Sequence, residues 1–295
     1  MTVRIAIYGA DEAVEGLLSF LSQQSEVEVI AVCDPIQRLA EQLASGWSAK
    51  VHDRFESMLD EQPDAVLILV RASLQSDAVL ASANRGVPFF VLPPGSSTVE
   101  QALACDEIVR EKSLISTVAY PSGYLDIAVE AREFLGDSSA PLAIGQMLCT
   151  GREPVEELEN LLWTRGSSML DLFRYFCGEV ESVESHSESV YHLRHATGTA
   201  STFILSALPR YEERTTLELL GEGWSLTLED SFRRLRVEEL DKVTILRSLR
   251  CPWEEHLLAF LEAVTNEDAS SLRCPFSEAL KTMELCQRAQ SSSSD

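Results

Sequence analysis

The sequence is short of basic residues. Its 295 residues include 24 Lys and Arg against 47 Asp and Glu, so the formal net charge is −23. A protein this acidic repels phosphate backbones and anionic lipids, so we expect neither nucleic acid nor a membrane surface as its partner. Long hydrophobic runs are also missing: AVLILV at 65–70 is far shorter than the about 20 residues of a membrane-spanning helix.

Two further absences concern the compartment. The N-terminus enters a strand-like segment, VRIAIYG at 3–9, without the cationic and apolar regions of a signal peptide. The seven Cys include no C-x-x-C pair, and most lie in hydrophobic stretches. This pattern is typical of buried free thiols in a reducing compartment. We therefore expect a cytoplasmic protein.

What is present is a regular alternation over the first 120 residues. The expected strands are 3–9, 27–34, 64–70, 87–92 and 115–120, and the expected helices are 12–24, 36–45, 54–61, 74–85 and 97–112. Alternating strands and helices predict an α/β domain with a parallel sheet, covered by helices on both faces. The strands read as continuous hydrophobic runs, as such coverage requires.

After residue 120 the pattern changes. A helix at 124–136, a strand at 141–151 and a helical stretch at about 155–177 come first, by the spacing of their hydrophobic residues. Strand-like runs then follow without helices between them, at 180–193, 199–208, 214–220, 224–229, 233–238 and 242–249. Such a series predicts a mostly antiparallel sheet. Helices at 252–266 and 276–290 end the chain, so residues 121–295 are expected to form an α+β domain.

The loop after the first strand has part of a dinucleotide-binding pattern. In an open parallel sheet, ligands bind beyond the carboxyl ends of the strands. Here Gly9 and Ala10 are followed by Asp11, and the second and third glycines of the pattern are replaced by Asp11 and Val14. A carboxylate about 4 Å from a pyrophosphate costs on the order of 4 kcal/mol at an effective dielectric constant of 20. The sequence therefore predicts that NAD binds weakly or not at all.

Two charged residues follow the next strands, and each has two interpretations. Asp34 could hold a ribose 2′-hydroxyl and disfavour a 2′-phosphate, or it could cap a helix that begins at Pro35. Arg71 could bind an anion, or it could pair with a nearby carboxylate. Ser96 and Ser97 precede the helix expected from 97 or 98 and are expected to cap it.

The order of these segments resembles the Gfo/Idh/MocA family of NAD(P)-dependent oxidoreductases over nearly the full length of the chain. The segments that carry the resemblance are VRIAIYGA, VEVIAVCDP, PDAVLILVRASLQSDAVLASANRG, STVEQALACDEIVREKSL, GSSMLDLFRYFCGEVESVES and RYEERTTLELLGEGWSLTLED. The resemblance implies a Rossmann-type domain at 1–120 and the family's α+β domain at 121–295. It also implies a small-molecule ligand and dimers or tetramers built by the second sheet.

The resemblance also locates the family's functional residues, and the first motif differs here. In the family a Glu-Lys-Pro motif follows the fourth strand, and its Lys contacts the substrate and assists proton transfer. Aligned on Pro94 and Thr98, this chain has Leu92 and Pro93 in place of the Glu and the Lys. After the third strand, the chain also has Arg71 and Gln75 where the family tends to have Pro and His.

The second motif also lacks residues that the family uses for catalysis. The family carries Asp-x-Gly-x-His-x-x-Asp, whose His is the usual acid/base. The corresponding TRGSSMLD keeps Gly166 and Asp171 but has Thr164 and Ser168 at the first Asp and the His. Hydride transfer at a carbinol carbon needs a group that exchanges the hydroxyl proton. Neither Pro93 nor Ser168 can do so unaided, and the four lysines lie in expected helix or strand bodies.

Two hypotheses follow, and they leave open whether the protein is an enzyme. In the first, the protein is a degenerate family member that acts as a small-molecule-binding protein or as a non-catalytic subunit. In the second, it is an active NAD-dependent oxidoreductase on a sugar-like or other small substrate, with Tyr124 as a relocated acid/base. For both Tyr120 and Tyr124, packing between domains is the alternative interpretation.

Two further expectations concern metals and assembly. His186, His192 and His195 lie near one another in sequence, but their spacing does not place all three on one face of a strand. We therefore expect solvated strand histidines and no metal site. In the run STFILSAL, Phe203 to Leu205 are consecutive hydrophobic residues, as in a strand covered on both sides. Either a second subunit or the chain's own terminal helices could provide that cover.

Overall fold

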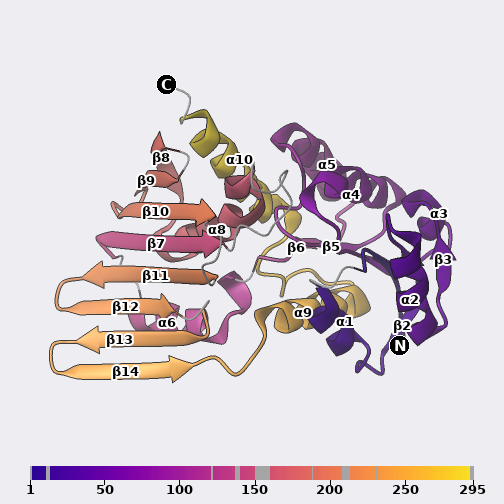
Figure 1. The fold of residues 1–295 in the computed structure, drawn as a ribbon, viewed down its shortest axis with the longest axis horizontal. Coiled ribbons are helices and arrows are strands. Elements are labelled where there is room, and N and C mark those ends of the chain that lie inside the picture. The colour runs from indigo at the N-terminus through magenta and orange to yellow at the C-terminus, as the bar shows by residue number, and fades with distance from the viewer. Residues whose placement is uncertain are drawn as a thin grey trace. The chain divides into compact units, whose positions relative to one another are not determined.

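The computed structural model describes residues 2–10, 14–120, 122–136, 140–149, 160–187, 189–207, 213–229 and 232–292 (Figure 1). The chain divides into two compact units. Unit 1 comprises Met1–Tyr120 and Trp253–Leu280, and unit 2 comprises Pro121–Pro252 and Lys281–Asp295. The expected fold class, a parallel sheet followed by a mostly antiparallel one, is confirmed.

Unit 1 is built on a six-stranded parallel sheet in the order β3-β2-β1-β4-β5-β6, which is the Rossmann order. Its strands are β1 Val3–Tyr8, β2 Val27–Cys33, β3 Lys50–His52, β4 Ala65–Ile68, β5 Phe89–Val91 and β6 Ser116–Val118. Five of them were expected. The edge strand β3 was missed because its three residues carry no run of hydrophobic side chains.

The helices of unit 1 cover both faces of this sheet, as its hydrophobic strands require. They are α1 Glu15–Leu21, α2 Gln37–Trp47, α3 Phe55–Leu59, η2 Ala72–Leu74, α4 Gln75–Arg85, α5 Val99–Glu111 and α9 Pro252–Asn266. Helix α9 comes from late in the chain. Its Leu257 and Phe260 are fully buried in the same hydrophobic cluster as Ile5 and Phe90. For this reason Trp253–Leu280 belongs to unit 1, whereas the expected division placed every residue after 120 in the second domain.

A buried histidine ties α9 to the sheet. The Nε2 atom of His256 lies 2.7 Å from the hydroxyl of Thr117 in β6, and that hydroxyl lies 2.6 Å from the carbonyl oxygen of Cys274. Burial lowers the pKa of His256 to about 3. The imidazole is therefore neutral at physiological pH, and it serves as a structural link rather than as a proton carrier.

Unit 2 is built on an eight-stranded sheet in the order β14-β13-β12-β11-β7-β10-β9-β8. Its strands are β7 Leu142–Cys149, β8 Val180–Ser187, β9 Val190–His195, β10 Ala200–Ala207, β11 Arg214–Gly221, β12 Trp224–Glu229, β13 Arg234–Glu239 and β14 Lys242–Arg247. Among the described strands of this sheet, only β7 and β10 pair in parallel. The expected single run 180–193 is in fact two strands, β8 and β9, which pair antiparallel.

The helices of unit 2 include η3 Ser122–Tyr124, α6 Asp126–Leu135, a π-helical turn at Leu162–Gly166 (η4) and α8 Ser167–Cys177. Helix α10, Phe276–Ser291, begins in unit 1 and ends in unit 2. The expected helical stretch from about 155 is described only from 160 onward. No helix in the described ranges is long and apolar enough to cross a membrane.

The second sheet has one buried face and one open face. Along β10, Phe203 and Leu205 are fully buried, whereas Ile204 between them is partly exposed. Phe203 packs against Phe173 of α8 with ring centroids 6.1 Å apart. Among the described residues of β10, therefore, full burial is found on one side of the strand and partial exposure on the other.

All seven cysteines are free, and six are buried, which confirms the expectation of buried thiols for all but the partly exposed Cys251. Burial raises the pKa of Cys33 to about 11, and those of Cys105 and Cys177 to about 12. These thiols are therefore poor nucleophiles at neutral pH.

Candidate functional site

The loop after β1 keeps one of the features that a dinucleotide-binding loop needs. Gly9 has a φ of +108°, and a Cβ built on it would lie 2.6 Å from the carbonyl oxygen of Leu69. Only glycine can occupy this position, because any side chain would collide with the neighbouring backbone. Asp11 lies outside the described residues, so the electrostatic argument about it stays a prediction.

Asp34, at the end of β2, joins this loop to the next one. Its carboxylate accepts a 2.8 Å hydrogen bond from the backbone N–H of Ala10 and a 2.7 Å hydrogen bond from that of Ile36. One of our interpretations held that Asp34 caps a helix that starts at Pro35. That interpretation was wrong, because helix α2 begins at Gln37. The carboxylate still has unused lone pairs, so a ribose hydroxyl could add a third donor.

Helix α1 follows this loop, whose residues 11–13 lie outside the described residues. Helix α1 has only seven residues, and Val14, at the position of the third glycine, is buried at its N-cap without a side-chain hydrogen bond. The backbone N–H of Ala10 is directed at Asp34 instead of outward. A helix this short offers little of the dipole that usually holds phosphate.

Negative charge surrounds the carboxyl ends of β1 and β2. The pKa of Tyr8 is raised by burial and further by Cys33, Asp34, Glu56 and Asp77. The pKa of Cys33 is raised by burial, with added contributions from Asp34 and Glu56. A 2′-phosphate placed here would meet the same carboxylates.

A neutral polar cluster lies where β4 and β5 end. Gln75 is 1% exposed, and its amide nitrogen donates to the carbonyl oxygens of Val70 at 2.9 Å and Pro93 at 3.4 Å. Its amide oxygen accepts a 2.9 Å hydrogen bond from the backbone N–H of Gly95. Gln75 thereby holds the loop 92–98, which contains the cis Pro93-Pro94 peptide, against the first turn of α4.

Serine side chains complete this cluster. The hydroxyls of Ser76 and Ser96 lie 3.0 Å apart, and Ser76 also accepts a 2.7 Å hydrogen bond from the backbone N–H of Ser97. The Ser97 hydroxyl donates to the carbonyl oxygen of Ala72 at 2.8 Å. The expected capping by Ser96 and Ser97 was wrong, because Thr98 caps α5. The two serines instead fix the loop to α4.

The loop 92–98 reads Leu-Pro-Pro-Gly-Ser-Ser-Thr and therefore contains no side chain that titrates near neutral pH. The lysines of unit 1 are used elsewhere. Lys50 donates to Glu61 at 2.5 Å, and Lys112 donates to the carbonyl oxygen of Asn84 at 2.6 Å. Neither lysine replaces the missing one at Pro93.

In unit 2, the residues of the second motif lie around the start of α8. Thr164, in the π-helical turn, donates a hydrogen bond to the carbonyl oxygen of Asn160 at 3.1 Å. Ser168 is partly exposed in the first turn of α8, and its neighbour Ser167 is fully buried. Gly166 fills a close-packed position, since a Cβ there would lie 3.0 Å from side-chain carbons of Leu162 and Leu205. Gly166 thus serves packing.

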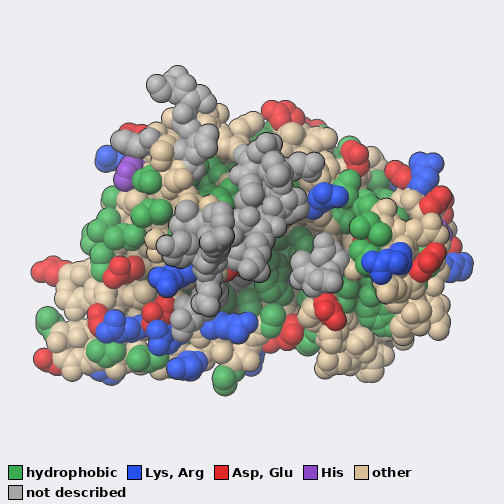
Figure 2. Space-filling model, in the orientation of Figure 1, with side chains coloured by type: hydrophobic (Ala, Val, Ile, Leu, Met, Phe, Trp, Pro, Cys, Tyr) green, Lys and Arg blue, Asp and Glu red, His purple; other side chains and the backbone are tan. Residues whose placement is uncertain are grey.

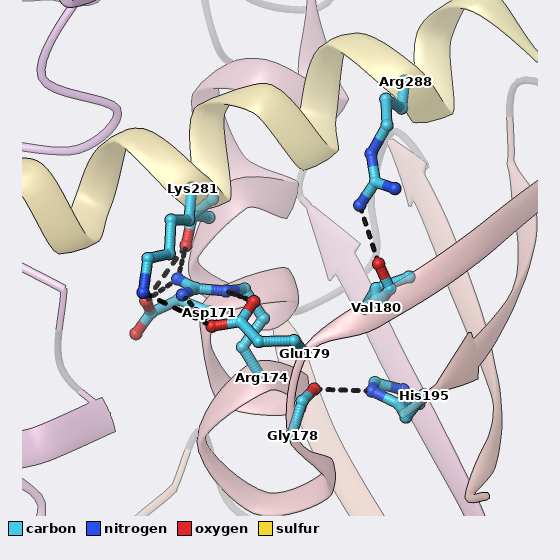
Figure 3. A network of polar contacts seen from close by, with 9 residues as sticks. Asp171, Arg174, Gly178, Glu179, Val180, His195, Lys281 and Arg288 are labelled. Carbon is cyan, nitrogen blue, oxygen red and sulfur yellow. Dashed lines mark hydrogen bonds and ion pairs between the residues drawn. The ribbon is translucent and has the colours of Figure 1, made fainter. Parts of the chain in front are cut away.

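The retained Asp171 belongs to a charged cluster (Figure 3). Arg174 of α8, whose side chain is 6% exposed, donates to the two carboxylate oxygens of Glu179 at 3.0 and 2.8 Å. It also donates to the hydroxyl of Thr282 at 2.7 Å, and that hydroxyl donates to Asp171 at 3.2 Å. The hydrogen bond from Arg174 lowers the pKa of Glu179. Asp171 is therefore used to join α8 to α10.

Of the three histidines of unit 2, the structure describes the side chains of His192 and His195. His195 is 1% exposed and lies 2.8 Å from both the carbonyl oxygen of Gly178 and the hydroxyl of Ser201, so the expectation of a solvated His195 was wrong. His192 is exposed, and its ring lies 3.1 Å from the Thr202 hydroxyl. The side chain of His186 lies outside the described residues. In the described ranges, no three His, Cys, Asp or Glu side chains are grouped as metal ligands.

The remaining candidates differ in exposure. Tyr120 is fully buried. Tyr124 in η3 is partly exposed, and Arg71 at the N-cap of η2 is exposed. The Gln75 cluster was not anticipated, because Gln75 and Gly95 are 20 residues apart and no local pattern links them. The only signal was that neighbouring parallel strands bring their following loops together.

Comparison with known proteins extends these observations. Residues 3–120 match the family model described as the oxidoreductase family with an NAD-binding Rossmann fold. The scyllo-inositol 2-dehydrogenase (NAD(+)) of Bacillus subtilis is 26% identical over 171 residues, which are 54% of this chain and 49% of that enzyme. The matched segment thus spans about half the length of the curated relative.

Solved structures share the fold over the whole chain. UDP-N-acetylglucosamine 3-dehydrogenase GnnA from Acidithiobacillus ferrooxidans superposes with a TM-score of 0.86 at 14% identity, over 99% of this chain and 98% of that one. An oxidoreductase from Agrobacterium radiobacter, in complex with NAD+, L-tartaric acid and magnesium, gives 0.85 at 15% identity, over 100% and 97%. At these identities the likeness concerns the fold alone.

Proposed function

We propose that this chain, whose residues 3–120 match the model of the Gfo/Idh/MocA oxidoreductase family, binds a small molecule without carrying out the family's hydride transfer. It acts either alone or as a non-catalytic subunit beside an active relative. The observation that carries the proposal is the loop 92–98, which has no titratable side chain and is held by neutral hydrogen bonds to Gln75.

The chemical argument rests on the missing proton carrier. Oxidation of an alcohol removes a hydride from carbon and a proton from oxygen, and that proton needs a nearby acceptor with a suitable pKa. Pro93 has no such group, and Ser168 is an alcohol itself. Asp171, the motif's remaining carboxylate, already accepts a hydrogen bond in the Arg174 cluster.

The cofactor proposed for this chain is NAD, bound weakly. Asp34 keeps the carboxylate that can accept a ribose hydroxyl, and the acidic surroundings of Tyr8 disfavour NADP. NAD, when bound to an active member, supplies or accepts the hydride. In this chain the short α1 and the inward Ala10 N–H weaken the hold on the pyrophosphate.

We extend the proposal to assembly and location. The second sheet presents hydrophobic side chains on its open face, among them the partly exposed Ile144, Leu148 and Ile204, and these suit a homo-oligomer formed through that sheet. Six buried free thiols suit a reducing compartment such as the cytoplasm.

The cofactor proposal is tested by titrating NADH fluorescence against the purified protein. We expect a dissociation constant for NADH well above the micromolar range. Weakened contacts to the pyrophosphate reduce the affinity tenfold for every 1.4 kcal/mol or so that they lose. Asp34→Ala should weaken binding further, while Gln37→Ala on the exposed side of α2 should leave it unchanged. Micromolar affinity for the wild-type protein would contradict the proposal.

The catalytic proposal is tested by incubating the protein with polyols and sugars, together with NAD or NADP, across the pH range in which it stays folded. A general acid/base contributes about 10² to 10⁴ in rate, so loss of two such groups should leave no detectable turnover. An active relative assayed in parallel is the positive control.

The partly exposed Tyr124 favours the second candidate function, an active NAD-dependent oxidoreductase on a sugar-like or other small substrate. A phenol can serve as an acid/base when its pKa is suitably shifted. Clear wild-type turnover that is abolished by Tyr124→Phe, but not by Tyr120→Phe, would establish this function in place of the first.

A further inference from the structure

Two hairpin turns lie at the same end of the sheet of unit 2 (Figure 1). Glu222 and Gly223 join β11 to β12, and Leu240 and Asp241 join β13 to β14. Two-residue turns favour Gly, Asn and Asp, because these residues readily adopt the backbone angles that such turns need. Leu240 is none of these, and its side chain is 89% exposed. It therefore contributes little to the turn or to the core of this chain.

A small apolar cluster of Phe134, Trp224 and Leu240, here called the tip cluster, lies at these turns. The indole of Trp224 lies against Gly221, where a Cβ would be 2.1 Å from the ring. Phe134, near the end of α6, packs edge-on against the same indole, with ring centroids 5.8 Å apart. The Cγ atom of Leu240 lies 3.8 Å from the position of a Cβ on Gly223. Phe134 is 39% exposed and Trp224 is partly exposed, so the tip cluster is open to solvent.

Four exposed carboxylates surround the tip cluster: Glu133, Glu222, Glu239 and Asp241. Each lies within two residues in sequence of a member of the cluster, and Glu239 also pairs with Trp224 in the register of β12 and β13. In the part of the chain that the structure describes, none of the four forms an ion pair. In Figure 2, hydrophobic and acidic side chains lie next to one another over the two turns.

This arrangement of charge selects the kind of partner. Nucleic acid and anionic lipid would be repelled, and a second copy that docked with the same surface would bring like charges together. A cationic partner would instead find four carboxylates without ion pairs, and an apolar side chain on it could cover Leu240. The net charge of −23 adds a long-range attraction for such a partner.

We propose that the tip cluster and its carboxylates form a docking surface for a basic segment of another protein, in which Lys or Arg residues alternate with hydrophobic ones. The hydrophobic side chains of the segment pack on Leu240 and Phe134, and its cations pair with the four carboxylates. The proposal does not depend on the ligand-binding function, because no residue of the tip cluster takes part in the sites described above.

Binding is tested with a short fluorescein-labelled peptide in which Lys and Leu alternate, titrated with the full chain and followed by fluorescence anisotropy. We expect saturable binding with a dissociation constant below about 100 μM, and weaker binding would overturn the proposal. A peptide of alternating Glu and Leu should not bind. Polylysine of the same length, which has no hydrophobic side chains, should bind at least about tenfold more weakly. Equal affinity for polylysine would show attraction by charge alone and would contradict the docking surface.

One substitution tests the apolar contact. Leu240→Ser should weaken binding of the Lys-Leu peptide about tenfold, because it removes the most exposed member of the tip cluster. Since that side chain is 89% exposed, the variant should fold as the wild type does. Leu103→Ser in α5 of unit 1, where the side chain is 42% exposed, is the matched control and should leave binding unchanged. Equal losses in the two variants would overturn the proposal.

A double substitution tests the charges. Glu222→Lys with Asp241→Lys should weaken peptide binding about tenfold at low salt, and less at high salt because exposed charges are screened. Glu107→Lys with Glu111→Lys, on the exposed surface of α5, changes the net charge equally and is the matched control. If the control pair weakens binding as much, overall charge alone attracts the peptide and the proposal is wrong. It is wrong as well if Leu240→Ser lowers the molecular mass in sedimentation equilibrium, because the tip cluster would then join two copies of this chain.

Discussion

The two polar clusters at the family's functional positions hold their surroundings by different means. In unit 1, the Gln75 cluster consists of neutral amides, hydroxyls and backbone groups. In unit 2, the Arg174 cluster holds a guanidinium and two carboxylates, of which Asp171 has a side chain only 8% exposed. Both clusters fasten a segment that follows a strand or a helix, but only the second depends on charge.

This difference determines how much stability each cluster loses when one of its residues is replaced or when the pH changes. Removing one partner of a buried ion pair leaves the other charge without compensation, which costs more than an unmade neutral hydrogen bond. A neutral cluster also keeps its strength across the pH range, while a charged one loses strength when its carboxylates are protonated. The predictions below use substitutions to measure that contrast.

The largest effect is expected for Arg174→Met, which keeps much of the volume but removes the charge. Asp171 would then be buried without its cation, so we expect a loss of about 3–5 kcal/mol in the free energy of unfolding. Urea unfolding followed by circular dichroism measures it. Arg236→Met is the matched control, because its partner Glu238 is 39% exposed and such surface pairs contribute about 0–1 kcal/mol. Equal losses in the two variants would show that the Arg174 cluster contributes no more than a surface pair.

A smaller effect is expected for Gln75→Leu, which is close in size but cannot form hydrogen bonds. The N–H of the buried Gly95 would lose its acceptor, so we expect a loss of about 1–3 kcal/mol. The same loss should be measured at pH 5.5 and pH 8, since no titratable group takes part. Gln37→Leu, on the exposed surface of α2, is the control. A loss that varied strongly with pH would show that the cluster is not neutral.

Asp34→Asn should cost less again. The amide keeps one acceptor oxygen, so one of the two hydrogen bonds from Ala10 and Ile36 is lost, at about 1–2 kcal/mol. Thermal unfolding, compared with Asp53→Asn on the exposed surface, measures the difference. If Asp34→Asn were as stable as wild type, the carboxylate would not be the link between the two loops.

The smallest effect concerns acid. Arg174 lowers the pKa of Glu179 in the folded protein below its unfolded value, which is about 4.3. The resulting stabilisation is complete above the unfolded pKa and is lost as the pH falls through the folded pKa. The Glu179 side chain is 57% exposed, so screening limits the contribution to less than about 1 kcal/mol. Between pH 6 and pH 3, the free energy of unfolding of Glu179→Gln should therefore fall slightly less than that of the wild-type protein. A larger fall for the variant would contradict the lowered pKa of Glu179.

The comparison of the clusters also shows what sequence reasoning could reach. Strands such as β1 and β4 were predictable because full burial on both faces leaves continuous hydrophobic runs. The assignment of Pro93 and Ser168 to the positions of the family's Lys and His stays a prediction, because it depends on aligning the family's motifs with this sequence residue by residue. The partners of Gln75 and Arg174 were not predictable, because they lie up to 108 residues away and depend on how the elements pack. His195 was misjudged for the same reason, since its burial comes from neighbours in space.

Helix α9 belongs to unit 1 but is translated after residues 121–252 of unit 2, and this order affects folding during synthesis. The hydrophobic face that receives Leu257 and Phe260 is complete in sequence by residue 120, yet its cover is translated only after about 130 further residues, several seconds later at typical elongation rates. During that interval the nascent first sheet exposes a surface that binds hydrophobic segments. Unit 1 therefore cannot complete its core before residues 121–252 of unit 2 have been synthesised. A fragment ending at Tyr120 should need a chaperone or a supplied α9 peptide to stay soluble.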